Sequence, residues 1–450
     1  MRIKTTFLQK KNRVWAIFAA FLLVTVASDA LSAEIEIPSS FNPVGSGARA
    51  LGMGGAFIAV ADDATAASWN PGGLTQLKKP ECSVVFSGLH RKEDISFGTN
   101  PEGDGMQSVS EEDLNYLSVT YPFEAWGRNM VVSLAYQHLY DFYREWEFTL
   151  NETVDDLSVS RRWEYDHAGR LSAIGLSYAV RVVPKLSLGF TLNFWDNDIT
   201  QNEWKQKYHM NGIESSDDIS FDRKLLARYR TYRFDGFNMN FGLLWRINYN
   251  LTFGAVLKTP FTADISRKEE QYWKVIESDS DIYTGSNIAS KADKLDMPMS
   301  YGIGVHYNFS DALSVSADLY RTEWSDYIYK TEDGPDYSPI TGRPISETSI
   351  DDTCQVRLGG EYRFMNKEKE YVVPIRFGVF YDPVPADGSP DDVYGISIGL
   401  GFTKNNFFSL DLSYQYRFGN NVGEIYLKHF DFSQDLDEHT VYASLIIYKW

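Results

Sequence analysis

The side chains that most often carry enzymatic chemistry form no recognised pattern in this 450-residue sequence. Its seven histidines are scattered, and none has the His-Glu-x-x-His spacing that places two zinc ligands on one helix face. No Gly-x-Ser-x-Gly nucleophile elbow of a hydrolase is expected. His138 falls on a predicted strand and is interpreted as a lumen or girdle residue. We therefore expect no enzyme, no cofactor and no metal site, although a serine and a histidine that meet only in space would escape this reasoning.

The remaining reactive and metal-ligating side chains also favour structural roles. Cys82 and Cys354 cannot build a disulfide framework, and we expect them as unpaired thiols on distant strands. Acidic residues recur between predicted strands, and their oxygens could bind calcium. None of these runs matches a complete calcium loop, so solvated segments facing a charged lipid surface are the simpler interpretation. The runs are Glu111, Glu112 and Asp113; Asp155 and Asp156; Asp217 and Asp218; Asp279 and Asp281; Asp351 and Asp352; Asp391 and Asp392.

The elements that would position any site are segments in which apolar and polar residues alternate. In Phe237–Ile247 every odd-numbered residue is large and apolar, whereas Asn238 and Asn240 lie between them. The same period of two occurs in Leu186–Phe194 and in Phe408–Phe418. Alternation of this kind indicates strands with one face toward an apolar medium.

Fourteen such strands are predicted, and the connections between them alternate between short and long. An even number of strands with short turns at one end and long loops at the other is typical of outer-membrane β-barrels, whereas a soluble sandwich has no reason to segregate its loops. We therefore predict an all-β, fourteen-stranded antiparallel transmembrane barrel. The predicted strands are 82–90, 113–123, 129–142, 168–182, 186–198, 232–247, 251–273, 294–309, 313–330, 352–364, 371–383, 392–404, 407–419 and 438–450. The predicted longer loops are 91–112, 143–167, 199–231, 274–293, 331–351, 384–391 and 420–437.

Composition agrees with a barrel in the outer membrane of a Gram-negative type of cell. Aromatic residues make up 15% of the chain, as two interfacial girdles would require. Mean hydropathy is −0.32 and no long apolar run follows residue 33, which excludes a helical membrane protein. The net charge of −18 becomes −22 without residues 1–33, which carry +4, and this field excludes nucleic-acid partners. The expected partners are outer-membrane lipid, lipopolysaccharide and, through the terminal aromatic Trp450, the barrel assembly machinery.

The first residues have the features of a secretory signal peptide. Basic residues in Arg2–Arg13 precede the apolar stretch Val14–Ala27, and cleavage after Ala30 or Ala33 fits the small residues that follow. The apolar stretch is too short for a membrane-spanning helix.

The segment before the barrel has another character, because it is rich in Gly and Ala and lacks alternation. Ala61–Asn70 is predicted as a short helix, with Asp62 or Asp63 as N-cap and with Pro71 and the next glycines ending it. Gly45–Ala50 loosely matches a dinucleotide fingerprint, which we reject because no βαβ unit surrounds it. Such small residues suit a backbone folded tightly inside a lumen. We divide the chain into a signal peptide (1–33), a plug called the hatch (34–81) and a transmembrane barrel (82–450).

Within this segment, Phe41–Leu74 closely resembles the N-terminal hatch of the long-chain fatty acid transporter family, which includes hydrocarbon-uptake barrels and relatives used in protein secretion. The resemblance implies a hatch that plugs a fourteen-stranded barrel, a hydrophobic ligand bound inside, and exit through the barrel wall. The family's Asn-Pro-Ala motif aligns with Asn70-Pro71-Gly72. Gly72 in place of Ala is a departure that weakens the transfer of hatch geometry.

The resemblance also selects candidate residues. The candidates for hatch structure and gating are Trp69, Asn70, Pro71 and Gly72. The candidates for lining the ligand path are Met53, Phe57 and Ile58. Packing within the hatch is the alternative role for the second set, and ending a helix is the alternative for Asn70 and Pro71. The third predicted strand, 129–142, contains no Gly or Pro that would predict a kink, so a lateral gate there rests on analogy.

Two functions remain open at this stage. The first is passive uptake of hydrophobic small molecules, either long-chain fatty acids or hydrocarbons, and an apolar lumen would favour it. The second is a secretion-type barrel that binds a secreted protein or other cargo through its loops. A general porin is disfavoured by the plug-like N-terminus.

Overall fold

The computed structural model describes residues 45–154, 157–215, 222–276, 281–332, 334–404, 407–424, 426–427 and 430–448. The expected signal peptide, residues 34–44 of the hatch and the terminal Trp450 lie outside the described residues. The same holds for three acidic sites noted above, namely Asp155 with Asp156, Asp217 with Asp218, and Asp279.

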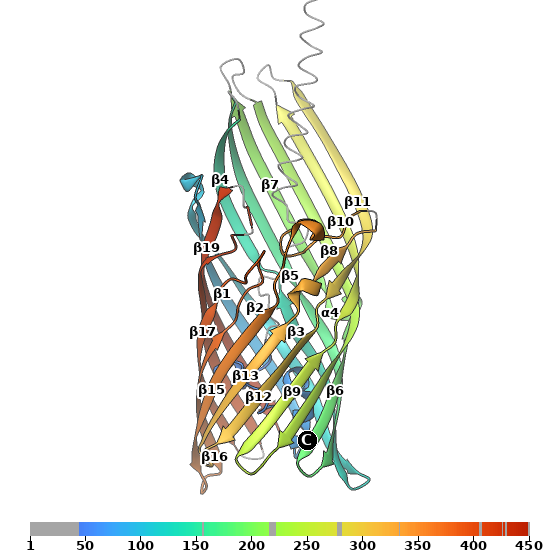
Figure 1. Ribbon diagram of the computed structural model, residues 1–450, viewed down its shortest axis with the longest axis vertical. Helices are drawn as coiled ribbons and strands as arrows, with labels where there is room; N and C mark the ends of the chain where they lie inside the picture. The colour runs from blue at the N-terminus through green and yellow to red at the C-terminus, as the bar shows by residue number, and fades with distance from the viewer. Residues whose placement is uncertain are drawn as a thin grey trace, which may run out of the picture.

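The alternating segments form one antiparallel sheet that closes into a barrel (Figure 1). Nine strands are continuous: β1 (Glu81–Phe97), β2 (Gly105–Ala125), β5 (Leu157–Val183), β8 (Asp222–Arg246), β15 (Thr353–Asn366), β16 (Tyr371–Tyr381), β17 (Tyr394–Lys404), β18 (Phe408–Val422) and β19 (Phe432–Ile447). Five strands each consist of two segments: β3 (Arg128–Asp141) and β4 (Arg144–Val154), β6 (Leu186–Trp195) and β7 (Glu203–Ser215), β9 (Leu251–Lys258) and β10 (Phe261–Ile276), β11 (Ile282–Met297) and β12 (Ser300–Asn308), β13 (Leu313–Thr322) and β14 (Ile328–Lys330).

Closure joins the first strand to the last. β1 pairs with β19 from Cys82 opposite Ile447 to Phe97 opposite Phe432. The fourteen-stranded antiparallel barrel predicted from the alternation is therefore confirmed. Cys82 on β1 and Cys354 on β15 lie on strands that are not neighbours, and both thiols are free.

The lengths of four predicted loops were wrong, because most residues of 91–112, 143–167, 199–231 and 274–293 belong to strands. Six of the strand segments concerned, β4, β5, β7, β8, β10 and β11, rise on one side of the barrel above the rest (Figure 1). The alternation fades there because both faces become polar. On β8, Arg223 and Arg233 point outward while Arg228 and Arg230 are buried on the inner face.

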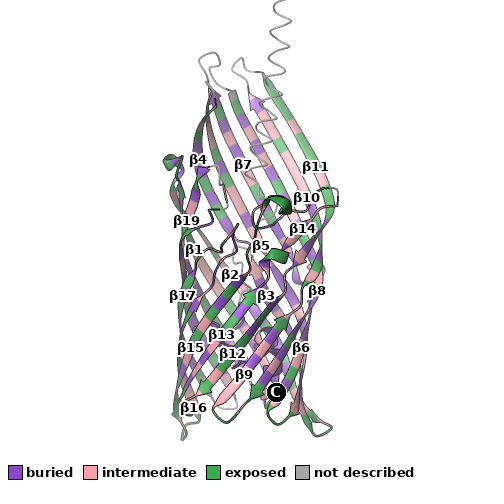
Figure 2. Ribbon diagram, viewed as in Figure 1, coloured by how far each residue is buried: buried purple, intermediate pink, exposed green. Residues whose placement is uncertain are grey.

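The apolar face of the alternation is the outer face of the barrel. Phe241 and Trp245 on β8 are 42% and 47% exposed, whereas Asn238 and Asn240 between the outward residues are buried (Figure 2). A band of exposed large apolar side chains thus surrounds the barrel at the height of β8 residues Phe237 to Trp245. This band is the surface that a lipid bilayer covers.

The described part of the hatch lies inside the barrel as short helices joined by tight turns. These are α2 (Ala48–Gly52), α3 (Ala66–Trp69) and the 3₁₀ helix η1 (Pro71–Gln76). The helix predicted over Ala61–Asn70 is shorter than expected, because the Asp63 carboxylate accepts hydrogen bonds from Thr65 and holds a turn before α3. The other short helices lie in connections: α4 (Asn197–Thr200), η2 (Pro101–Gly103), η3 (Trp324–Asp326) and η4 (Ile345–Glu347). In the part of the chain that is described, no helix is long and apolar enough to cross a membrane.

Candidate functional site

Polar side chains on the inner wall hold the hatch through its backbone. The carboxylate of Asp318 on β13 accepts hydrogen bonds from the amides of Phe57 at 2.7 Å and Ile58 at 2.9 Å. The hydroxyl of Ser444 on β19 accepts one from the amide of Ala48 at 2.7 Å. These buried donors would otherwise lack partners, since short helices satisfy few of their own groups. The wall therefore determines the path of the hatch.

Ser397 anchors the hatch in the same way, although its surroundings match a catalytic spacing. The expectation that the chain lacks this spacing was wrong, because Gly395–Gly399 reads Gly-x-Ser-x-Gly, as in a nucleophile elbow. The segment runs straight through β17 and makes no strand-to-helix turn. The Ser397 hydroxyl accepts from the Gly54 amide at 2.8 Å and donates to the Gly52 carbonyl oxygen at 3.2 Å. The Ser397 hydroxyl thus holds the hatch backbone in place.

Glycines on the inner wall allow the hatch backbone to approach closely. A Cβ atom at Gly254 of β9 would lie 2.5 Å from the carbonyl oxygen of Ile58, and one at Gly189 of β6 would lie 2.5 Å from that of Pro71. Both distances are below van der Waals contact, so a side chain at either position would displace the hatch. Further wall glycines that meet the hatch are Gly242, Gly302, Gly304, Gly359, Gly378 and Gly399.

The three residues of the aligned motif lie together at the junction of α3 and η1. Asn70 is fully buried, and its side-chain oxygen accepts from the Gly72 amide at 3.1 Å. Its side-chain nitrogen donates to the carbonyl oxygens of Ile58 at 2.7 Å and Leu243 of β8 at 2.9 Å. Pro71 begins η1, where its missing N–H is not needed. Asn70 thus both caps a helix and joins two parts of the hatch to the wall.

The ligand-path candidates divide between the core of the hatch and the walls of cavities. Met53 and Phe57 are buried in an apolar cluster within the hatch. Ile58 and Trp69 line a cavity of about 30 Å³ beside β9, β13 and β15. Trp69 also lines a second cavity, and its ring meets Phe57 edge-on with centroids 6.1 Å apart.

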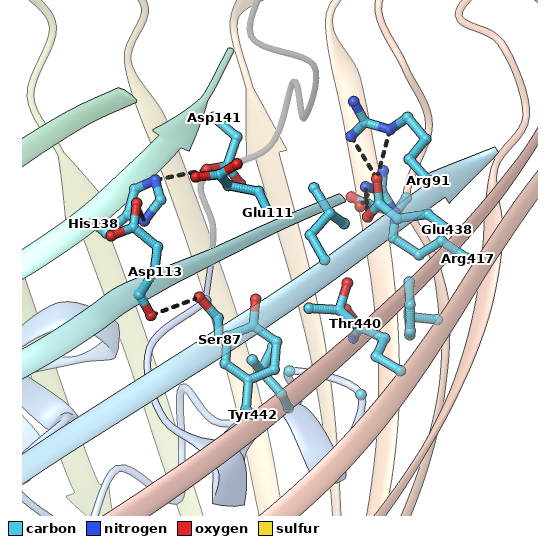
Figure 3. Close-up of a pocket in the computed structure, with 18 of the residues that line it drawn as sticks. Ser87, Arg91, Glu111, Asp113, His138, Asp141, Arg417, Glu438, Thr440 and Tyr442 are labelled. Carbon is cyan, nitrogen blue, oxygen red and sulfur yellow. Dashed lines mark hydrogen bonds and ion pairs between the residues drawn. The ribbon is translucent and has the colours of Figure 1, made fainter. Parts of the chain in front are cut away.

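This second cavity, of about 70 Å³, lies between the hatch and the inner wall (Figure 3). Leu51 and Trp69 of the hatch contribute apolar surface, and so do Leu89, Phe380 and Tyr442 of the wall. Most of its other lining residues are charged or polar. The lumen at this height is therefore not the uniformly apolar channel that would be the simplest sign of a hydrophobic ligand.

One side of the cavity carries a buried network of ion pairs (Figure 3). The guanidinium of Arg91 on β1 lies 2.6 Å from the carboxylate of Glu438 on β19. Arg417 on β18 contacts the same carboxylate at 3.0 Å and Asp382 at 3.1 Å. Removal of one member would leave an uncompensated buried charge. The network spans the junction of β1 and β19, so it forms only when the barrel closes.

The opposite side of the cavity meets a gap in the barrel wall. The ladder between β2 and β3 ends where Tyr116 faces Gln137. Above that point β2 pairs with β1, and β3 and β4 pair with β5. No backbone ladder among the described residues joins the two sides there. β3 itself shifts register between His138 and Tyr140 and ends at Asp141, although no Gly or Pro is present. We call this gap the seam.

A charged cluster fills the seam (Figure 3). His138 is buried, and its Nε2 lies 2.7 Å from the Asp141 carboxylate, while its Nδ1 lies 3.6 Å from that of Asp113 on β2. Arg170 of β5 contacts Asp113 from the other side of β3. His138 thus lines the internal cavity at the seam, which fits the expected lumen position and not a girdle position. Side-chain contacts replace the missing ladder. The repeated large apolar residues after His138, which interrupt the alternation, were the only signal of this break in the sequence.

A row of stacked, buried aromatic rings runs across neighbouring strands of the inner wall to the seam. Phe142, which lies between β3 and β4, stacks on Trp204 of β7, and Trp204 stacks on Tyr232 of β8. In both pairs the ring centroids are 4.8 Å apart and the planes differ by 6°. These rings belong to a larger buried apolar cluster that includes Trp195, Phe234, Trp324 and Tyr329. The stack ends at the break in the wall.

Two cations line the smaller cavity beside Ile58 and Trp69. The Arg357 guanidinium lies 5.7 Å from the Trp69 ring centre and donates to the Gln355 side chain at 2.6 Å. The Lys258 ammonium lies 5.7 Å from the Tyr320 ring centre. Within the described ranges, neither cation has a carboxylate at ion-pair distance. Arg357 also lines the larger cavity, so it connects the two. The same described ranges contain no group of His, Cys, Asp and Glu side chains suited to a metal ion.

Charge also links the hatch to the wall at Arg49 of α2. Its guanidinium lies 2.5 Å from Asp62 and 3.3 Å from Glu361 of β15. Burial lowers the pKa of Arg49, but the nearby carboxylates outweigh this effect and raise the pKa, so the guanidinium stays charged. Burial raises the pKa of Asp63, and Arg49 at 3.9 Å only partly opposes that shift.

Solved structures with the same architecture are known. The CymD monoaromatic hydrocarbon channel is 18% identical, has a TM-score of 0.53, and the alignment covers 90% of this chain and 98% of that one. A Pseudomonas aeruginosa FadL homologue is 14% identical with a TM-score of 0.57, over 92% and 99% of the two chains. The Pseudomonas putida toluene transporter TodX is 12% identical with a TM-score of 0.53, over 90% and 98%. At these identities the likeness shows the fold. Among curated proteins, none matches the sequence.

The family model described as outer membrane protein transport protein (OMPP1/FadL/TodX) matches residues 23–429. This match confirms the family resemblance seen in Phe41–Leu74, the outer-membrane location and a role in transport. The family is one of transport proteins and not of enzymes, and the secretion-type alternative is not favoured. The chain therefore belongs to the OMPP1/FadL/TodX family of outer membrane transport proteins.

Proposed function

We propose that this protein mediates the passive uptake of long-chain fatty acids or hydrocarbons, and that these ligands leave the lumen laterally through the seam. The observation that carries the proposal is the missing ladder between β2 and β3 beside an internal cavity. A continuous wall would force an apolar ligand to cross water below the hatch. On β3 the gap begins next to Tyr136, which is in register through β5 and β6 with Phe237 at the edge of the apolar band, and it lets the ligand pass from one apolar medium to another.

The aromatic stack supplies apolar surroundings beside this route. Its rings, such as Trp204 and Tyr232, are buried in the inner wall, and an acyl chain that packs against apolar groups gains about 0.8 kcal/mol for each buried methylene. The stack leads to Phe142 at the seam, next to the polar cavity. Two solved proteins with this fold are a monoaromatic hydrocarbon channel and a toluene transporter, which supports ligands of this class.

The two cations that line the smaller cavity favour fatty acids over plain hydrocarbons. Lys258 and Arg357 flank a cavity whose remaining walls include Tyr320, Trp69 and Ile58. A carboxylate would complete the pairing of both cations, and an acyl chain would lie against the rings. A plain hydrocarbon offers neither cation a partner. Of the ligand-path candidates, we assign Ile58 and Trp69 to the path, and Met53 and Phe57 to hatch packing.

Several further assignments belong to this proposal. Residues 1–33 are removed as a signal peptide, residues 34–81 form the hatch, and residues 82–450 form the barrel. Asn70, Pro71 and Gly72 fix the hatch and have no catalytic part, and the protein needs no cofactor. The apolar band meets outer-membrane lipid and lipopolysaccharide, and the terminal strand is the element that the barrel assembly machinery recognises.

The test combines ligand identification with closure of the seam. Native mass spectrometry of the detergent-purified mature protein is expected to detect a copurified acyl ligand, and a fluorescent fatty acid is expected to bind saturably. Asp113→Cys and His138→Cys are combined in a background with Cys82→Ser and Cys354→Ser. Joining the two new thiols with a short bis-maleimide is expected to block cellular uptake but not binding. The untreated double-cysteine variant is the control.

Three results would contradict the proposal. An empty barrel without saturable binding would remove fatty acids as ligands. Unchanged uptake after cross-linking would remove the lateral exit. A copurified protein in place of a small molecule would favour the secretion-type alternative.

A further inference from the structure

The strands that rise above the apolar band carry a groove on their outer surface. Four adjacent strands, β5, β7, β8 and β10, enclose a cavity of about 290 Å³ there. The small side chain of Ala227 lies opposite His209 on one neighbouring strand and Tyr272 on the other. Longer side chains surround it, and the outward members of the lining are Arg162, Glu164, His209, Asn211, Leu225, Ala227, Tyr272 and Lys274.

The height of this groove excludes lipid tails as its occupant. On β8, Ala227 precedes Phe237, the highest residue of the apolar band, by ten residues. At about 3.3 Å per residue and a tilt of about 40°, the groove lies roughly 25 Å above the band. Charged side chains such as Arg233 and Asp235 separate the two on the same face. In an outer membrane, this layer contains the sugars of the outer-leaflet glycolipid.

Polar contacts hold the aromatic walls of the groove in a fixed arrangement. The Tyr229 hydroxyl lies 2.9 Å from Nε2 of His209, whose Nδ1 lies 3.8 Å from Glu164. The rings of Tyr229 and Tyr272 meet edge-on with centroids 6.3 Å apart, and the Tyr272 hydroxyl donates to Glu270 at 3.1 Å. Tyr272 is nevertheless 43% exposed. Exposed but ordered rings of this kind present an apolar face beside hydrogen-bonding groups.

The groove also presents a cation. In the described part of the chain, no carboxylate lies at ion-pair distance from Lys274, which borders the groove on β10. This contrasts with most other cations on the outer face nearby, since Lys207 pairs with Asp166 and Lys268 with Glu270. A sugar chain has apolar C–H faces, several hydroxyl groups and, when phosphorylated, negative charge, and it matches all three features of the groove.

We propose that this groove binds the core oligosaccharide of lipopolysaccharide in the outer leaflet. The proposal rests on the outer-membrane location and is independent of what the barrel transports. A glycan held here would extend the contact with the glycolipid from the apolar band to the raised strands. It would also fix the orientation of the long-strand side of the barrel in the sugar layer.

The test measures binding of two purified lipopolysaccharides to the immobilised, detergent-solubilised mature protein. One has a complete core and the other is truncated to lipid A and the innermost sugars. Ala227→Trp fills the groove, and Tyr272→Ala removes one aromatic wall. Ala292→Trp is the matched control, because Ala292 is also exposed on the outer face of the raised strands but lies outside the groove. Heat-modifiable migration verifies that each variant is folded.

We expect wild type and Ala292→Trp to bind the complete core at least tenfold more tightly than the truncated form, and both groove variants to lose this difference. Equal binding of the two forms by wild type, or an Ala227→Trp variant that binds like the control, would overturn the proposal. So would a wild-type dimer that Ala227→Trp converts to monomer without changing glycan binding, because the groove would then hold a second copy. Fatty-acid binding by the same variants should stay unchanged.

Discussion

Replacement of Asp318 by Ala should loosen one turn of the hatch without opening the barrel. The carboxylate accepts two buried amide hydrogen bonds, from Phe57 and Ile58, at 2.7 and 2.9 Å. Leaving a buried amide without its hydrogen-bond partner costs about 1 to 3 kcal/mol, so losing both bonds should cost about 2 to 6 kcal/mol of local stability. This corresponds to an increase of roughly 30- to 10⁴-fold in amide exchange. Hydrogen-exchange mass spectrometry of a peptide covering residues 53–61 measures it.

The control is Asp318→Asn, which keeps a side-chain oxygen for both amides and should raise exchange by about tenfold or less. Peptides from the β1 and β19 ladder should exchange as in wild type, because that pairing does not involve the hatch. If Asp318→Ala leaves the hatch peptide unchanged, the wall does not determine the path of the hatch. If the ladder also exchanges faster, the residue supports the barrel as a whole.

Other changes test the remaining contacts. Gly254→Val should destabilise the hatch by about 1 to 3 kcal/mol, because its side chain would enter the hatch backbone, whereas Gly88→Val meets open space and should melt like wild type. Arg357→Gln should weaken fatty-acid binding about tenfold in a competition assay and leave binding of a neutral alkane unchanged, since only the acid offers a charged partner. Burial raises the pKa of Asp63 above its unfolded value of 3.8. Its contribution to stability is therefore present below pH 3.8 and is lost as the pH rises from 3.8 through the raised pKa. Asp63→Asn should therefore raise the melting temperature at neutral pH and flatten its pH dependence, and a variant with the wild-type slope would exclude this residue as the cause.

Alternation was enough to predict the number of strands because it is a local property of each one. Phe237, Phe241 and Trp245 face lipid and their neighbours face the lumen, so each strand shows its two environments in its own sequence. The same reasoning failed above the membrane. Where β8 carries arginines on both faces, the period of two disappears, and strands were mistaken for loops.

The hatch was recognisable from Phe41–Leu74, but its internal geometry was not. The predicted helix over Ala61–Asn70 assumed that capping alone decides helix length. In the barrel, the hydrogen bonds of Asn70 to Ile58 and Leu243 determine the turn, and these partners lie on other parts of the chain. The α-helix does end directly before Pro71, as expected, and Pro71 also begins the 3₁₀ helix η1.

The sequence by itself determined the number of strands, the face of each strand that meets lipid and the segment that fills the lumen, because each of these depends on neighbours in the chain. Only the tertiary structure decided the site. Arg91 and Glu438 are 347 residues apart and pair because closure brings the first and last strands together. The seam exists because β2 keeps its ladder with β1 while β3 and β4 keep theirs with β5. The sequence of a single strand does not determine which of its two neighbours it pairs with.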